Sequence, residues 1–325
     1  MPTTIRTGLL AARARGALRP ALALAGLVAI AAACSSTGPS ASATVAPDGL
    51  VALVATADST SLLGWSATSA KPVPIKLPNG DTTWVATGRA DVLAAALANG
   101  TTATSDPIHL GKSLAWRTVK AKDASGDPVT GHQDYVAWDP EGGRFATLLG
   151  DLLSGDGISV VLVDPSARSA FAIPVDRSVV AAPPVWIGPD RLVVVTGDAS
   201  SPGATIVDTE TGDLSDGPVG ARLLAASADG RRVATMDAPG DPVVIRETDA
   251  WLGGDGSSIA SISPPTGSTS SIAFALDANG QRLVVAWQAK DGSVTLDVYD
   301  GRSAWKRVSK PAVGAARGAV VAWRR

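Results

Sequence analysis

Short apolar runs separated by acidic, glycine-rich turns recur along most of this chain. In the clearest unit, the apolar run 135–138 is followed by the turn residues 139–143 and by a second, mostly apolar strand, 144–148. Aromatic and β-branched residues favour strands, whereas Asp, Pro and Gly favour tight reversals of the backbone. The unit therefore predicts a β-hairpin.

Weaker copies of this hairpin follow at 185–193, 226–234 and 273–283, and a fainter copy lies at 83–93. The apolar residue that opens each second strand provides an anchor for alignment. The six anchors are Leu50, Val92, Phe145, Leu192, Val233 and Leu283. Their spacings are 42, 53, 47, 41 and 50 residues. A period of roughly 40–50 residues with several short strands in each unit is typical of a β-propeller.

The two ends of the repeat region complete one another. Residues 319–323 form a first strand with no second strand after it, and residues 46–53 form a turn and second strand with no first strand before them. Pairing these ends closes a ring and removes an open sheet edge. We therefore expect an all-β fold over residues 47–325. It is a six-bladed β-propeller with four-stranded blades, in which the C-terminal strand closes the first blade.

Three details inside the units sharpen this expectation. The alanine-rich run 94–98 reads as a strand rather than a helix, because a hairpin turn, Asn99-Gly100, follows it directly. An Asp closes the third strand in several units and is interpreted as a turn cap; these are Asp164, Asp208 and Asp300. The fifth unit departs from the pattern around 249–252, so its register stays open.

Tryptophan is frequent for a chain with few aromatic residues, since nine of its residues are Trp. Several occupy repeat positions, namely Trp84, Trp138, Trp186 and Trp323. We interpret these as packing between blades in preference to a stacking platform for ligands.

The turn sequence resembles the TolB-type, WD40-like repeat of bacterial envelope proteins, whose usual form is W-S-P-D-G-K-R-I-A. Residues 137–146, A-W-D-P-E-G-G-R-F-A, and residues 227–234, S-A-D-G-R-R-V-A, match it best. The likeness covers most of 47–323. It implies a propeller of the bacterial envelope but no particular activity, because propellers host enzymes, binders and scaffolds.

Residues 1–33 are predicted to be a lipoprotein signal peptide. Four arginines and no acidic residue precede the apolar run 21–33, which is short for a membrane span of about 20 residues. The run ends A-A-A-C and resembles a bacterial lipobox, although Ala31 stands where Leu is commoner. Cys34 would then carry lipid, such as palmitate. The alternative is an ordinary secretory signal with an incidental cysteine.

Residues 34–46 are expected to be the lipidated Cys34 and a flexible tether of small, uncharged residues. Cys34 is the only cysteine, so the chain cannot form an internal disulfide. Removing the four leader arginines from 28 Lys and Arg leaves 24 against 30 Asp and Glu, a net charge of −6. This acidic balance argues against nucleic acid as a partner. The expected location is the extracytoplasmic face of the cell membrane.

The sequence offers little chemistry for catalysis. It has two histidines, His109 and His132, and no H-E-x-x-H, C-x-x-C, G-x-S-x-G or nucleotide-binding loop. We therefore predict no metal site, no cofactor and no catalytic residues that can be named. Residues 277–280 resemble part of a calcium loop, but the missing ligands favour a plain turn.

These observations favour a binding or scaffold module of the cell envelope. Its membrane contact is the lipid anchor, and its partner is an envelope protein or a small ligand. The alternative is a propeller-fold hydrolase or lyase acting on envelope glycans or peptides; a structural subunit of an envelope complex is a third possibility. The funnel mouth of the propeller is the expected working surface. Its candidate ligand contacts are His132, Asp134, Arg177, Arg222 and Arg317.

Overall fold

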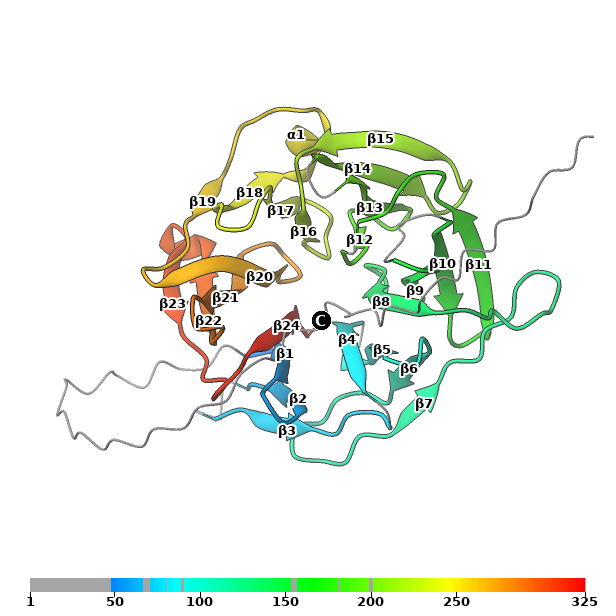
Figure 1. The fold of residues 1–325 in the computed structure, drawn as a ribbon, viewed down its shortest axis with the longest axis horizontal. Coiled ribbons are helices and arrows are strands. Elements are labelled where there is room, and N and C mark those ends of the chain that lie inside the picture. Colours follow the sequence, from blue (N-terminus) through cyan, green and yellow to red (C-terminus); the bar gives the residue numbers. More distant parts are fainter. Residues whose placement is uncertain are drawn as a thin grey trace, which may run out of the picture. The chain divides into compact units, whose positions relative to one another are not determined.

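Six four-stranded antiparallel sheets stand around one axis, like the blades of a propeller (Figure 1). The computed structural model describes residues 48–66, 71–79, 81–88, 91–152, 157–180, 182–198 and 201–324. The predicted signal peptide, Cys34 and the tether lie outside these residues. The expected all-β, six-bladed fold is confirmed.

The first three blades use strands of three to six residues. Blade 1 contains β24 (Gly318–Trp323), β1 (Leu50–Ala55), β2 (Thr60–Gly64) and β3 (Val73–Ile75). Blade 2 contains β4 (Thr82–Thr87), β5 (Leu93–Leu97), β6 (Thr102–Ser105) and β7 (Trp116–Thr118). Blade 3 contains β8 (Gln133–Trp138), β9 (Phe145–Leu149), β10 (Ser159–Asp164) and β11 (Ser169–Pro174).

The last three blades are built on the same plan. Blade 4 contains β12 (Val185–Trp186), β13 (Arg191–Asp198), β14 (Ser201–Asp208) and β15 (Leu214–Val219). Blade 5 contains β16 (Leu223–Ala226), β17 (Arg232–Met236), β18 (Val243–Glu247) and β19 (Ala260–Ile262), with the short helix α1 (Thr248–Leu252) before β19. Blade 6 contains β20 (Ser268–Leu276), β21 (Arg282–Ala289), β22 (Val294–Asp300) and β23 (Lys306–Ser309), with the 3-10 turn η2 (Gly301–Ser303) before β23.

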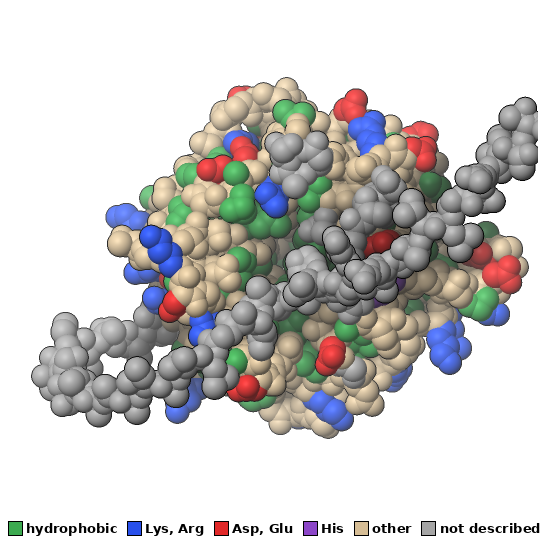
Figure 2. Space-filling view, in the orientation of Figure 1, with side chains coloured by type: hydrophobic (Ala, Val, Ile, Leu, Met, Phe, Trp, Pro, Cys, Tyr) green, Lys and Arg blue, Asp and Glu red, His purple; other side chains and the backbone are tan. Residues whose placement is uncertain are grey.

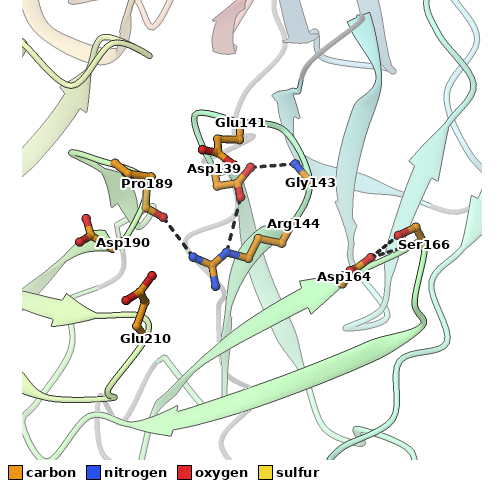
Figure 3. A pocket seen from close by; sticks show the side chains of 9 residues that line it. All are labelled: Asp139, Glu141, Gly143, Arg144, Asp164, Ser166, Pro189, Asp190 and Glu210. Carbon is orange, nitrogen blue, oxygen red and sulfur yellow. Dashed lines mark hydrogen bonds and ion pairs between the residues drawn. The ribbon is translucent and has the colours of Figure 1, made fainter.

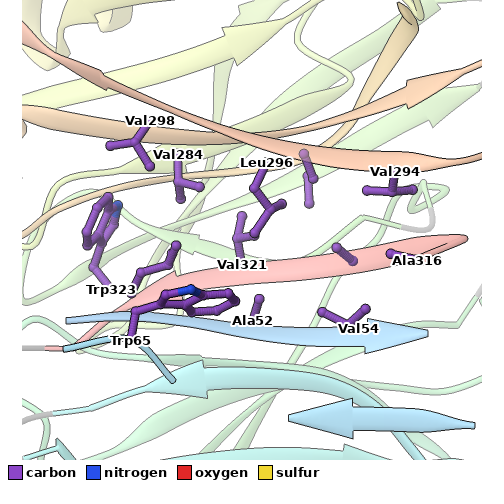
Figure 4. Close-up of a cluster of buried hydrophobic side chains, with 14 residues drawn as sticks. Ala52, Val54, Trp65, Val284, Val294, Leu296, Val298, Ala316, Val321 and Trp323 are labelled. Carbon is purple, nitrogen blue, oxygen red and sulfur yellow. The ribbon is translucent and has the colours of Figure 1, made fainter. Parts of the chain in front are cut away.

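The ring closes as the two chain ends predict. β24 is the inner strand of blade 1 and pairs with β1, from Leu50 opposite Trp323 to Ala55 opposite Gly318. A buried cluster between blades 6 and 1 holds this joint, with Trp65, Leu296 and Trp323 among its members (Figure 4). Every strand pairing of the described residues lies within 50–323, so the ring is complete without the residues before 48.

Successive strands of a blade run in opposite directions, so their connecting loops lie on two opposite faces of the propeller. We define the turn face as the face with the loops that join first to second and third to fourth strands. The connector face carries the loops between blades and those joining second to third strands. The chain enters β1 on the turn face, where the Arg324 amide donates to Gly49 O at 2.7 Å.

One anchor of the sequence alignment is wrong by one residue. In blade 2 the end of the first strand, Thr87, pairs with Leu93, whereas Val92 lies in the turn and its carbonyl accepts from the Gly88 amide.

The predicted strand over 94–98 is confirmed, because 94–97 lie in β5. The open register of blade 5 is explained by α1, which occupies the connection that is a tight turn in blades 3 and 4.

The aspartates that close third strands cap turns, as predicted. Asp164 Oδ1 accepts from the Ser166 amide at 2.8 Å, and Asp208 and Asp300 make equivalent contacts. The residues 277–280 form a plain turn, in which the Gly280 amide donates to Asp277 O at 3.0 Å. Bonds from turn donors stabilise the charged form of a carboxylate. The pKa of Asp208 is accordingly below its usual value, mainly because of the amides of Thr211 and Glu210.

Two interfaces between blades are held by stacked Arg and Trp side chains. The Arg282 guanidinium lies 4.4 Å from the ring centre of Trp323, and Arg144 lies 5.3 Å from that of Trp186. Each indole N–H donates to a carbonyl of the preceding blade. The predicted packing role is confirmed for the buried Trp138, Trp186 and Trp323. Trp138 differs from the other two, since its buried Nε1 has no acceptor among the described residues.

Candidate functional site

The six inner strands enclose a channel along the propeller axis. Its cavity has a volume of about 150 Å³ and is lined by 22 residues drawn from all six blades. None of these 22 side chains is charged or titratable, and the one hydroxyl, on Thr87, donates to the Trp323 carbonyl. The aromatic part of the lining consists of Trp84, Trp138, Trp186, Phe274 and Trp323.

Small side chains at one equivalent position of each inner strand keep this channel open. The position before the last residue of each inner strand is occupied by Ala in five blades and by Val in the sixth. Strand pairing shows that these positions are equivalent, since each is one step before the end of its first hairpin strand. The ring consists of Ala86, Ala137, Val185, Ala225, Ala275 and Ala322.

The predicted His132 and Asp134 lie together beside the connector end of β8. His132 Nε2 lies 3.2 Å from Asp134 Oδ1, and both side chains are partly exposed. Gly100 fits tightly against His132, because a Cβ there would lie 2.6 Å from His132 Nδ1. The pair is positioned by a bulge between β8 and β9, where Tyr135 has a φ of 58°.

The three predicted arginines lie on three different connectors and contact neither one another nor this pair through any hydrogen bond in the described residues. Arg177, between blades 3 and 4, pairs with Asp216 of β15. Arg317, between blades 6 and 1, donates to Asp291 O at 2.5 Å. Arg222 lies between blades 4 and 5 and is half-buried. The five candidates therefore share the connector face without forming one cluster.

A second hollow lies on the turn face between blades 3 and 4 (Figure 3). Its volume is about 440 Å³, and five carboxylates and one arginine from four different turns line it. Arg144 crosses it, with Nη2 donating to Pro189 O at 3.0 Å and Nε lying 3.5 Å from Asp139 Oδ2. Sequence reasoning missed this hollow, because its acids are Asp139, Glu141, Asp164, Asp190 and Glu210, spread over more than seventy residues.

Two carboxylates of this hollow, those of Asp139 and Asp164, stabilise the turns that carry them. Asp139, which is buried, accepts from the Gly143 amide at 2.9 Å, and Arg144 binds the same carboxylate. Burial raises the pKa of Asp164, but the Ser166 hydroxyl and the amides of Ser166 and Ala167 lower it further, so it lies below its usual value. An aspartate held charged in this way is unsuited to donate a proton near neutral pH.

The described residues include neither a metal-binding set nor a membrane-spanning helix. Among the described residues, no three His, Cys, Asp or Glu side chains form a set that could hold a metal ion. Nor does any helix in the described part of the chain have the length and apolar character to cross a membrane. On the face that Figure 2 shows, basic and acidic side chains mix around the rim, so neither sign dominates the visible edge.

Both tyrosines of the chain have raised pKa values and should ionise only at high pH. Burial, followed by the Asp134 charge, raises the pKa of Tyr135 to about 12, and burial followed by Asp297 raises that of Tyr299 to about 12. The unfolded value is near 10. Because the folded state keeps these protons longer, their contribution to stability is intact below pH 10 and is lost between pH 10 and 12.

This predicts an ultraviolet titration with almost no tyrosinate absorbance at pH 10.5 in the folded protein. After unfolding in denaturant, both tyrosines should titrate near pH 10. A Tyr135→Phe variant should halve the late absorbance change. Native tyrosinate appearing with a midpoint near pH 10 would show that neither ring is shielded.

The geometry defines the class of this protein as a six-bladed β-propeller closed by its C-terminal strand. No protein-family model matches the chain, and no curated protein matches its sequence. Solved structures match its fold. TolB from Acinetobacter baumannii matches with a TM-score of 0.60 and 13% identity, covering 84% of this chain and 66% of that chain. This chain thus spans just under two thirds of the length of that TolB.

A protein from Lactobacillus plantarum matches with a TM-score of 0.52 and 16% identity, covering 85% of this chain and 99% of that chain. Identities this low show a common fold and carry no activity with them. The TolB-type likeness of the repeats is therefore supported at the level of the fold.

Proposed function

We propose that this chain is a lipid-anchored, extracytoplasmic β-propeller that acts as a binding or scaffold module of the bacterial cell envelope. The observation that carries the binding role is the axial cavity, because 22 uncharged lining residues provide no general acid, general base or nucleophile. A hydrolase or lyase working at this cavity would need such groups, so no second function is proposed.

The envelope location rests on the sequence. The basic, apolar leader ending at Cys34 is the pattern of an exported lipoprotein. The ring needs nothing before residue 48 to close, so a lipidated Cys34 and a tether of small residues can hold it without taking part in the fold. Two or more acyl chains on such a cysteine would give stable membrane attachment, whereas a single chain binds a membrane only marginally.

Acyl labelling in a bacterial host tests the anchor. The wild-type chain should incorporate labelled palmitate and lose its first 33 residues. Cys34→Ala should incorporate none and accumulate with its leader attached, whereas the matched control Ser35→Ala should behave as wild type. Processing of Cys34→Ala at the wild-type size, with no label in either protein, would identify an ordinary secretory signal and contradict the lipid anchor.

Turnover assays test the binding role. The protein should leave cell-wall glycan fragments and peptides unchanged over many hours, at concentrations of protein that saturate binding. Release of a defined product, abolished by replacing one carboxylate of the turn-face hollow such as Asp190→Asn, would contradict a purely binding role.

A further inference from the structure

The axial cavity selects against charge. Moving an ion from water into an uncharged site costs several kcal/mol unless a partner replaces its hydration. No lining side chain carries a charge, and the one hydroxyl already donates to the Trp323 carbonyl, so only backbone dipoles are left to replace the hydration of an ion. An uncharged molecule is therefore favoured in this cavity.

The volume sets the size of that molecule. Apolar cavities of about 150 Å³ accommodate a single six-membered ring. The axial cavity has this volume, and the ring of alanines provides the width by leaving methyl groups where larger side chains would meet on the axis. Five of the six internal repeats keep Ala at this position, while the following residue varies among Thr, Trp, Ala and Leu.

The walls supply both apolar contact and polar handles. Four indoles and the Phe274 ring reach the wall, and the small part of each that is exposed gives another ring an aromatic surface to pack against. Each inner strand is the last strand of its sheet, so one edge of its backbone pairs with no other strand. Two of the carbonyls, those of Ala137 and Ala275, are taken by indole N–H groups. Other backbone groups along these edges can bond a hydroxyl.

We propose that the channel binds a small uncharged ring alcohol of about six to ten non-hydrogen atoms, in contact with Trp186, Phe274 and Trp323. This inference rests on the binding role proposed above and assigns that role to the axial cavity. The proposal disfavours carboxylates of the same shape, because no side chain of the lining carries the opposite charge.

The test uses residues 36–325, which contain every strand of the ring. Benzyl alcohol is the probe, benzoate is its charged counterpart, and binding is followed by saturation-transfer NMR and by the shift of the Trp indole N–H signals. Benzyl alcohol should saturate, and benzoate should bind at least about tenfold more weakly, a difference of about 1.4 kcal/mol.

Two variants place the binding in the channel. Ala275→Leu fills the cavity and should weaken benzyl alcohol at least about tenfold, while Ala172→Leu, on the exposed outer strand β11, should leave the affinity unchanged. If Ala275→Leu does not fold, the smaller Ala322→Val replaces it and should weaken binding in the same direction. Thermal unfolding without probe confirms that each variant used is folded.

Three results would overturn the proposal. They are the absence of saturable benzyl alcohol binding below about 10 mM, equal affinity for benzoate, and unchanged affinity in a folded cavity-filling variant. Any of these results would remove the axial cavity as the site of the binding role, whereas the lipid anchor and the absence of turnover are measured separately. Conversely, an unlipidated Cys34 would leave the channel proposal standing.

Discussion

Deleting residues 314–325 abolishes cooperative folding of the propeller. The deletion removes β24, whose Ala319, Val321 and Trp323 are buried between blades 6 and 1. Burying one large apolar side chain is worth about 1.5–3 kcal/mol, and a whole domain has only about 5–15 kcal/mol of net stability. The loss also leaves the edge of β1 open to other chains. Circular dichroism on heating should show no sharp transition, and the protein should aggregate.

A circular permutant restores β24 at a new position in the chain, so it tests whether the deletion acts through the loss of this strand. Residues 311–325 are moved ahead of Asp48 through a short glycine linker, and the new chain ends at Lys310. Because the Arg324 amide and Gly49 O are only 2.7 Å apart, the linker spans the joint without strain. The permutant should regain a sharp unfolding transition. If the deletion variant unfolds cooperatively at the wild-type temperature, β24 does not close the ring.

Replacing Trp323 or Trp186 by Ala should cost about 3–5 kcal/mol each, as expected for emptying a large buried site. Both are more than nine-tenths buried and lie under an arginine at an interface between blades. Each substitution also leaves a carbonyl of the preceding blade without its indole donor, that of Ala275 for Trp323 and that of Ala137 for Trp186. Urea unfolding of each variant measures the free-energy change.

Trp138 provides the matched comparison, because it occupies the same strand position but its Nε1 has no acceptor in the described chain. Trp138→Phe removes a buried N–H that makes no bond, whereas Trp186→Phe and Trp323→Phe each break one bond. The latter two should therefore cost about 1 kcal/mol more than Trp138→Phe. Equal costs at the three sites would mean that the indole bonds contribute nothing to the joints.

The sequence predicts the fold well because its main determinants are local and repeated. The turn chemistry of 139–143 sets one hairpin, its period sets the number of blades, and the incomplete ends at 46–53 and 319–323 set the closure. The anchor at Val92 is the exception. The turn of blade 2 lacks the Asp, Pro and Gly spacing of the others, so nothing local distinguishes Val92 from Leu93.

The site is less predictable because it depends on which strands meet. The ring of alanines is visible in the sequence as a recurring apolar-Ala pair, as at 136–137 and 321–322, but only strand pairing shows that these positions share one level of the channel. The stacking of Arg144 on Trp186 joins residues 42 positions apart in neighbouring blades. The connector-face arginines were predicted together because their loops share a face, yet each belongs to a different connector.

The most direct test of this account is a crystal structure of residues 36–325 grown with benzyl alcohol. The account predicts electron density for one ring on the propeller axis, against Trp186, Phe274 and Trp323, with its hydroxyl bonded to an inner-strand backbone group. A channel that holds only ordered water, with the alcohol bound on the outer surface, would contradict it.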